Sequence, residues 1–129
     1  MDKKKIILDC DPGMDDSMAI VMACKSEALD VLAVTTVNGN YPAEVTCVNA
    51  LKVLEMIGRT DVPAGKGMVA PMVRATPKDP FSHGADGQAE NFLPEPTTPR
   101  SHLPYERGPH RHQCGSPALQ LRLQRVQSK

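Results

Sequence analysis

The sequence lacks several features that would point to particular classes of partner. Its formal net charge is zero, so no excess of basic residues favours nucleic acid or an anionic membrane. It also lacks a long apolar run: the longest, Met18 to Cys24, has seven residues, whereas a membrane span needs about 18. We therefore expect neither nucleic acid nor a membrane as a partner.

Paired cysteines and an export signal are also lacking. The four cysteines, Cys10, Cys24, Cys47 and Cys114, show no metal-ligand spacing. The apolar run that follows the basic residues 3–5 is too short for a secretory signal. Reduced thiols without such a signal indicate a cytoplasmic protein.

The balanced charge hides a change in composition near residue 100. Residues 101–129 contain one acidic residue and five Lys or Arg, whereas residues 1–100 contain 14 acidic and 10 basic residues. The later part is broken by Pro and Gly and has few large apolar side chains. We predict two parts: a folded domain over 1–99 and an irregular, disordered tail over 100–129.

Apolar periodicity in the first part predicts alternating strands and helices. Strands are expected over 5–10, 30–37 and 61–64, helices over 18–24 and 42–57, and loops over 65–100. The first strand is expected to be buried on both faces. Such alternation is typical of an α/β fold: an open, mostly parallel Rossmann-like sheet with flanking helices, here followed by the irregular tail. One face of the second helix is expected to face the core, through Cys47, Ala50, Leu51, Leu54 and Ile57.

Four carboxylates lie within eight positions directly after the first predicted strand: Asp9, Asp11, Asp15 and Asp16. Asp9 and Asp11 are expected on one face at the carboxyl end of the strand, where open α/β sheets bind ligands. A tight turn at Pro12 can fold the later pair back over the same spot. Hard carboxylate oxygens suit Ca²⁺ or Mg²⁺. Solvated acids at a helix start are the alternative, but the full pattern favours a metal or catalytic site.

The stretch DCDPGMDD, residues 9–16, resembles the signature of the inosine-uridine-preferring nucleoside hydrolases. Further similarities to that family lie in VTTVNGN at 34–40, NAL at 49–51, HGADG at 83–87 and AENFLPEPTT at 89–98. The resemblance covers about residues 4–98. It implies a truncated nucleoside hydrolase fold, in a family whose members often form homo-oligomers.

The resemblance also implies an activity and a cofactor. The family are glycosidases that hydrolyse the N-glycosidic bond of ribonucleosides to ribose and free base, with bound Ca²⁺. On this basis Asp11 is the catalytic base towards a calcium-activated water and also a metal ligand. Asp16 is a bidentate metal ligand, and Asp9 lies on the metal side. A cation in the cluster would offset the repulsion between these carboxylates.

Three further residues are implied to bind the substrate: Asp15, Asn40 and His83. Asp15 would hold the ribose hydroxyls, and Asn40 would lie near the sugar. Asn40 follows Gly39 and could instead only form a turn, and a loop histidine such as His83 is often a surface residue. The chemistry fits the family because carboxylates stabilise the positive charge that develops on the sugar.

The resemblance ends near Pro99. The later part of the family supplies a further aspartate and a carbonyl ligand for calcium, and a histidine for the departing base, and we find no counterparts here. We interpret the tail as an out-of-frame or misjoined translation, which resequencing of the coding DNA near codon 100 tests. We expect this chain alone to bind Ca²⁺ weakly, to be marginally stable and to be a poor catalyst.

Two other functions are considered. A strand ending in D-x-D also opens the haloacid-dehalogenase-like phosphatases, but those carry Thr or Val where Gly13 stands here. The second alternative is a non-catalytic fragment or interaction module that binds an intact relative.

Overall fold

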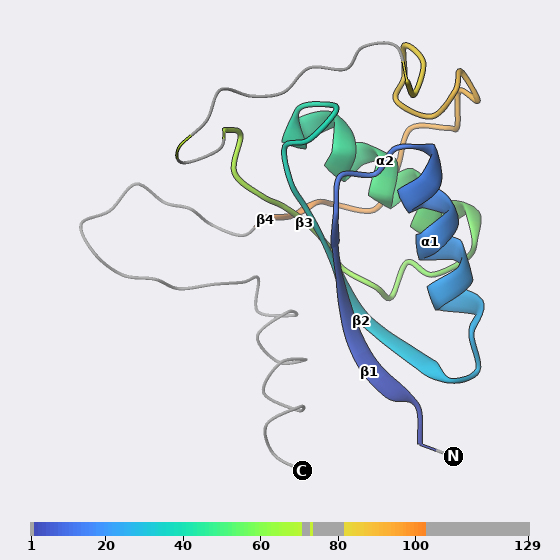
Figure 1. Cartoon of the computed structure of the whole chain (residues 1–129). Helices are drawn as coiled ribbons and strands as arrows, with labels where there is room; N and C mark the ends of the chain where they lie inside the picture. The colour runs from blue at the N-terminus through green and yellow to red at the C-terminus, as the bar shows by residue number, and fades with distance from the viewer. Residues whose placement is uncertain (1, 71–72, 74–81, 103–129) are drawn as a thin grey trace.

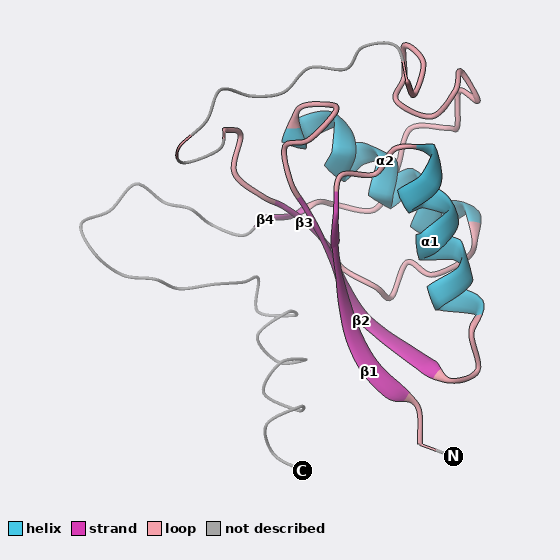
Figure 2. Cartoon of the chain, viewed as in Figure 1, coloured by secondary structure: helices cyan, strands magenta, loops and turns pink. Residues whose placement is uncertain are grey.

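The computed structural model describes residues 2–70, 73 and 82–102. The elements in chain order are β1 (Lys4–Cys10), α1 (Met14–Lys25), β2 (Leu29–Thr36), α2 (Ala43–Met56), β3 (Ala64–Lys66) and β4 (Ser101–His102). The strands form one sheet in the order β1-β2-β3-β4, and every neighbouring pair is parallel (Figure 1, Figure 2). The predicted α/β fold with a mostly parallel sheet is confirmed.

Both helices lie on the same side of the sheet (Figure 1). This follows from the strand order, because right-handed crossovers that add strands in one direction bring successive helices to one face. Side chains of β1 accordingly alternate: Ile6 and Leu8 pack against the core, whereas Ile7 is 43% exposed. The expectation that this strand is buried on both faces is wrong, because no helix covers its second face in the described residues.

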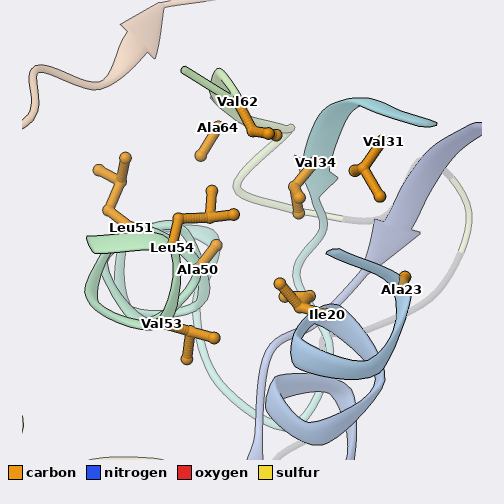
Figure 3. Packing of buried hydrophobic residues seen from close by; sticks show 10 residues of the cluster. All are labelled: Ile20, Ala23, Val31, Val34, Ala50, Leu51, Val53, Leu54, Val62 and Ala64. Carbon is orange, nitrogen blue, oxygen red and sulfur yellow. The ribbon is translucent and has the colours of Figure 1, made fainter. Parts of the chain in front are cut away.

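The core lies between this face of the sheet and the two helices (Figure 3). It consists of Ile20, Ala23, Val31, Val34, Ala50, Leu51, Val53, Leu54, Val62 and Ala64. The predicted core face of α2 is confirmed at Cys47, Ala50, Leu51 and Leu54, which are at most 1% exposed. Ile57 lies just beyond the helix, which ends at Met56. Burial of each large side chain contributes about 1.5–3 kcal/mol, so α2 is the main anchor of the fold.

Two short strands differ from the prediction. β3 begins at Ala64, because Pro63 has no N–H to pair within a sheet. β4, residues 101–102, lies beyond the predicted boundary near residue 100 and pairs with β3. Residues 103–129, the rest of the predicted tail, lie outside the described residues. Within the described ranges, neither helix has the length and apolar character needed to cross a bilayer.

Candidate functional site

The site begins where β1 and β2 end. Asp11 follows β1 directly, and Asn40 lies in the turn after β2. The backbone N–H of Asn40 donates a hydrogen bond to Asp11 Oδ2 at 3.0 Å. Gly39 leaves the room for this contact, because a Cβ at that position would lie 1.9 Å from Asp11 Oδ2. The carboxyl ends of neighbouring parallel strands therefore bring Asp11 and Asn40 together.

Asp15 and Asp16 lie in the first turn of α1, where acidic side chains face the positive end of the helix dipole. The Asp16 carboxyl lies close enough to Asp11 to interact with its charge. Burial, and then the charges of Asp11 and Asp15, raise the pKa of Asp16 above its usual value. Burial and the neighbouring carboxylates also raise the pKa of the Cys10 thiol to about 12, so it stays neutral. The result is a close carboxylate pair, Asp11 and Asp16, with Asp15 beside it.

Asp9 has a different environment from the pair. It projects from the exposed side of β1, and its Oδ1 accepts a hydrogen bond from the Thr35 hydroxyl at 2.6 Å. Asp9 and Thr35 are partners in the register of β1 and β2, so this bond ties the two strands. Across residues 2–70, 73 and 82–102, no three His, Cys, Asp or Glu side chains form a group that could hold a metal ion. Among the described residues, we therefore take Asp11 and Asp16 as the interacting pair of carboxylates at the site.

His83 joins the site from a distant segment. Its Nδ1 accepts the backbone N–H of Met14 at 3.3 Å and lies 4.0 Å from Asp15 Oδ1. Its Nε2 lies 2.7 Å from the side-chain amide of Asn40. The side chain is only 12% exposed, and a Cβ at Gly13 would lie 2.7 Å from Nδ1. The three predicted substrate-binding residues, Asp15, Asn40 and His83, are thus neighbours.

These contacts determine the tautomer of the imidazole. Because Nδ1 accepts the Met14 N–H, the proton of the neutral ring lies on Nε2. In the structure Asn40 Nδ2 is the atom that lies 2.7 Å from Nε2, so the amide must turn its oxygen towards the ring before Nε2 can donate to it. His83 is therefore held between the first turn of α1 and the side-chain amide of Asn40.

The loop that carries His83 is organised by Asp86. The Asp86 carboxylate accepts backbone N–H groups of Gln88, Glu90 and Phe92 at 2.8–3.1 Å. Burial acts to raise the pKa of Asp86, but these bonds outweigh it and the pKa is lowered. This local network gives the loop a defined shape without any regular element.

Three residues that position the site were missed from the sequence. The Tyr41 hydroxyl donates to Gly84 O, next to His83. Gln88 Nε2 donates to Ser17 Oγ at 3.1 Å and so joins the loop to α1. Asn49 is a buried amide on α2 that reaches the carbonyls of Pro12 and Asp86. Only Asn49 had a usable signal: it is a polar residue on the apolar side of a predicted helix.

A family model described as inosine-uridine preferring nucleoside hydrolase matches residues 6–122. The chain belongs to this family. The pyrimidine-specific ribonucleoside hydrolase RihA of Photobacterium profundum is 45% identical over 93 residues, which are 72% of this chain and 30% of that protein. RihA of Escherichia coli O1:K1 / APEC is 46% identical over 92 residues, 71% of this chain and 30% of the relative.

Solved structures agree with this assignment. A plant nucleoside hydrolase, PpNRh1, superposes with a TM-score of 0.66 at 39% identity, over 80% of this chain and 34% of that one. The purine-preferring ribonucleoside hydrolase from Gardnerella vaginalis superposes with a TM-score of 0.70 at 29% identity, over 75% and 32%. The family assignment argues against the phosphatase alternative.

The length of the match bears on what the chain can do alone. The chain spans 30% of the length of the curated relatives it matches. The family model extends to residue 122, past the boundary predicted near residue 100. The two-part division of the chain stays a prediction.

Proposed function

We propose that this chain carries the ribose- and calcium-binding part of a nucleoside hydrolase, whose reaction is hydrolysis of the N-glycosidic bond. One observation carries the proposal: Asp11, Asn40 and His83 come from three separate segments and are linked by hydrogen bonds, and Asp15 Oδ1 lies 4.0 Å from His83 Nδ1. Carboxylates and amides bind the hydroxyl groups of a sugar, and carboxylates also stabilise the positive charge that a ribosyl group acquires as the base departs.

The donor set fits a hard divalent cation. Asp11 and Asp16 would hold it, with Asp9 adding negative charge from the neighbouring position on β1. The raised pKa of Asp16, caused by burial and then by the Asp11 and Asp15 charges, supports this assignment, because a cation would relieve the same repulsion. When bound, calcium would supply positive charge that makes a water molecule more acidic. Ca²⁺ takes about 6–8 oxygens, so we expect weak binding by this chain alone.

Different side chains would serve as the catalytic base and as the groups that bind the sugar. Asp11 would accept the proton of the attacking water, because it is a carboxylate held in a fixed position by Asn40 N–H. Asp15 is exposed and free to accept hydrogen bonds from ribose hydroxyls. Asn40 and His83 would hold the sugar on its other side through their shared amide and imidazole contact.

The relatives indicate which part of the substrate this region recognises. One is named pyrimidine-specific and another purine-preferring, yet both are named for ribonucleosides. The region matched here is common to both, so we propose that it recognises the ribose and not the base. Because the chain spans 30% of its curated relatives, we expect slow turnover, and a non-catalytic binding role remains the second candidate.

Titration of the full chain with inosine, uridine and 2′-deoxyuridine in the presence of CaCl₂, followed by NMR, tests the proposal. We expect similar affinities for the two ribonucleosides and weaker binding of the deoxynucleoside. Asp15→Asn should weaken the binding of both ribonucleosides equally, whereas Asp30→Asn, at the start of β2, should leave their binding unchanged. Absence of ribonucleoside binding, or equal affinities for uridine and 2′-deoxyuridine, would overturn the proposal. Release of reducing sugar measured alongside distinguishes slow hydrolysis from binding alone.

A further inference from the structure

A buried amide on α2 contacts both loops that form the site. Asn49 is 2% exposed and lies among apolar residues of the helix. Its Nδ2 donates to the carbonyl of Pro12 at 3.1 Å and to the carbonyl of Asp86 at 3.3 Å. Pro12 follows the base Asp11 directly, and Asp86 organises the loop of His83.

The chemistry of the amide suits this bridging position. A side-chain NH₂ has two N–H donors, so one nitrogen can serve two carbonyls. Both acceptors are backbone groups, so the contact fixes the course of the chain and not only one rotamer. The loop also approaches closely at Gly87, where a Cβ would lie 2.9 Å from Asn49 Nδ2. An apolar side chain at position 49 would leave the two carbonyls without these donors.

Other contacts between the same segments end on α1, which is packed less deeply than α2. The exposed Met14 N–H donates to His83 Nδ1 at 3.3 Å, and the buried Gln88 donates to the half-buried Ser17 at 3.1 Å. Asn49 alone among these donors belongs to α2, the helix that is most deeply packed in the core. A rigid element therefore provides the reference point from which both loops are held.

We infer that Asn49 is a positioning residue that holds the Pro12 turn and the His83 loop in one arrangement, so that Asp11 and His83 keep their relative places. The contact is seen in the structure. Its importance for the binding of calcium and ribose rests on the proposed function. Outer partners of this kind typically change metal affinity about tenfold or more when they are removed.

Two readouts on the full chain test this inference. Hydrogen exchange is measured at the Ala89 amide, which is bonded to His83 O at 2.7 Å, and Ca²⁺ affinity is measured by calorimetry. Asn49→Leu removes both N–H donors and keeps a side chain of similar size. Gly87→Ala places a Cβ 2.9 Å from Asn49 Nδ2 and should move the loop away from the amide. Leu54→Ala, in the core of α2, is the control for loss of stability without loss of the contact.

We expect Asn49→Leu and Gly87→Ala to speed exchange at Ala89 selectively and to weaken Ca²⁺ binding by the folded protein about tenfold. Leu54→Ala should lower stability without either effect. If Asn49→Leu does not fold, Gly87→Ala tests the same contact by comparison with Gly58→Ala, which carries the same positive-φ strain but has nothing within 4 Å of the added Cβ. The inference would be overturned if the exchange rate at Ala89 depended only on the free energy of unfolding, in the same way in Asn49→Leu, Gly87→Ala and Leu54→Ala. A wild-type chain that binds no Ca²⁺ would overturn the proposed function, while exchange still decides the role of Asn49.

Discussion

The two helices differ sharply in how they are held. α2 has eight buried residues, whereas α1 has two, Ile20 and Ala23. On α1 the side chains of Met14, Met18 and Met22, spaced four apart on one face, are 42%, 60% and 67% exposed. Yet α1 carries Asp15 and Asp16, the acidic residues of the site. Fold stability and site geometry therefore depend on different parts of the molecule.

Polar contacts compensate for the weak packing at the start of α1. His83 accepts the N–H of Met14, Gln88 donates to Ser17, and the Ser17 hydroxyl donates to Gly13 O at 2.6 Å. The first two of these bonds come from the loop over residues 83–88, which is itself tied to α2 through Asn49. The site end of α1 is thus fixed to the core helix through a loop, in addition to its own buried side chains.

The largest expected effect is on the stability of the core. Leu54→Ala on α2 should lower the free energy of unfolding by about 2–5 kcal/mol, because it leaves a cavity at a residue that is 1% exposed. Met22→Ala on α1 should change it by about 0.5 kcal/mol or less. Urea denaturation measures both. Similar losses for the two variants would contradict the contrast between the helices.

The next effect separates site geometry from stability. Gly39→Ala should weaken Ca²⁺ binding about tenfold, because its Cβ would displace the Asp11 carboxylate. Gly58→Ala is the matched control: its φ is +72°, but nothing lies within 4 Å of the added Cβ. It should cost about 1 kcal/mol of stability and leave calcium affinity unchanged. Calorimetry and denaturation together check the pair, and equal calcium affinities in the two variants would argue against a role of Asp11.

The smallest effect concerns pH. Burial, followed by the charges of Asp11 and Asp15, raises the pKa of Asp16 from its ordinary 3.8, so the folded state holds this proton more tightly than the unfolded state. Deprotonation of Asp16 therefore costs stability as the pH rises above about 4, where the unfolded state ionises. Without calcium, Asp16→Asn should gain a few tenths of a kcal/mol over the wild type at neutral pH, because solvent screens this half-buried group.

That gain should shrink towards pH 3, and urea denaturation across this range measures it. Asp30→Asn removes the same charge at the start of β2, away from the carboxylate pair, and serves as the control. If the stability gained by Asp16→Asn did not grow with pH, the carboxylates of Asp11 and Asp16 would not repel each other in the folded state.

Local patterns predicted the elements that depend on nearby residues. The core face of α2 was predicted because helical periodicity is a property of one segment, and the helix expected over 18–24, which lies within α1, was predicted from its own apolar residues in the same way. The exposure of Ile7 on β1 was not predicted, because it depends on the side to which both helices pack. That side follows from the strand order, which no single segment encodes.

The site shows the same division. Asp11, Asn40 and His83 were selected by their resemblance to a family pattern, and the structure brings them together. Their roles stay predictions. The bond between Asp9 and Thr35 spans 26 positions in sequence and depends on strand register, so this partner of Asp9 could not be predicted from local patterns.

Calorimetric titration of Ca²⁺ into the wild type and Asp16→Ala decides whether Asp11 and Asp16 form a calcium site. We predict weak, saturable binding by the wild type and none by Asp16→Ala, with both proteins folded by circular dichroism. Equal binding by the two proteins, or no binding by the wild type, would contradict the account.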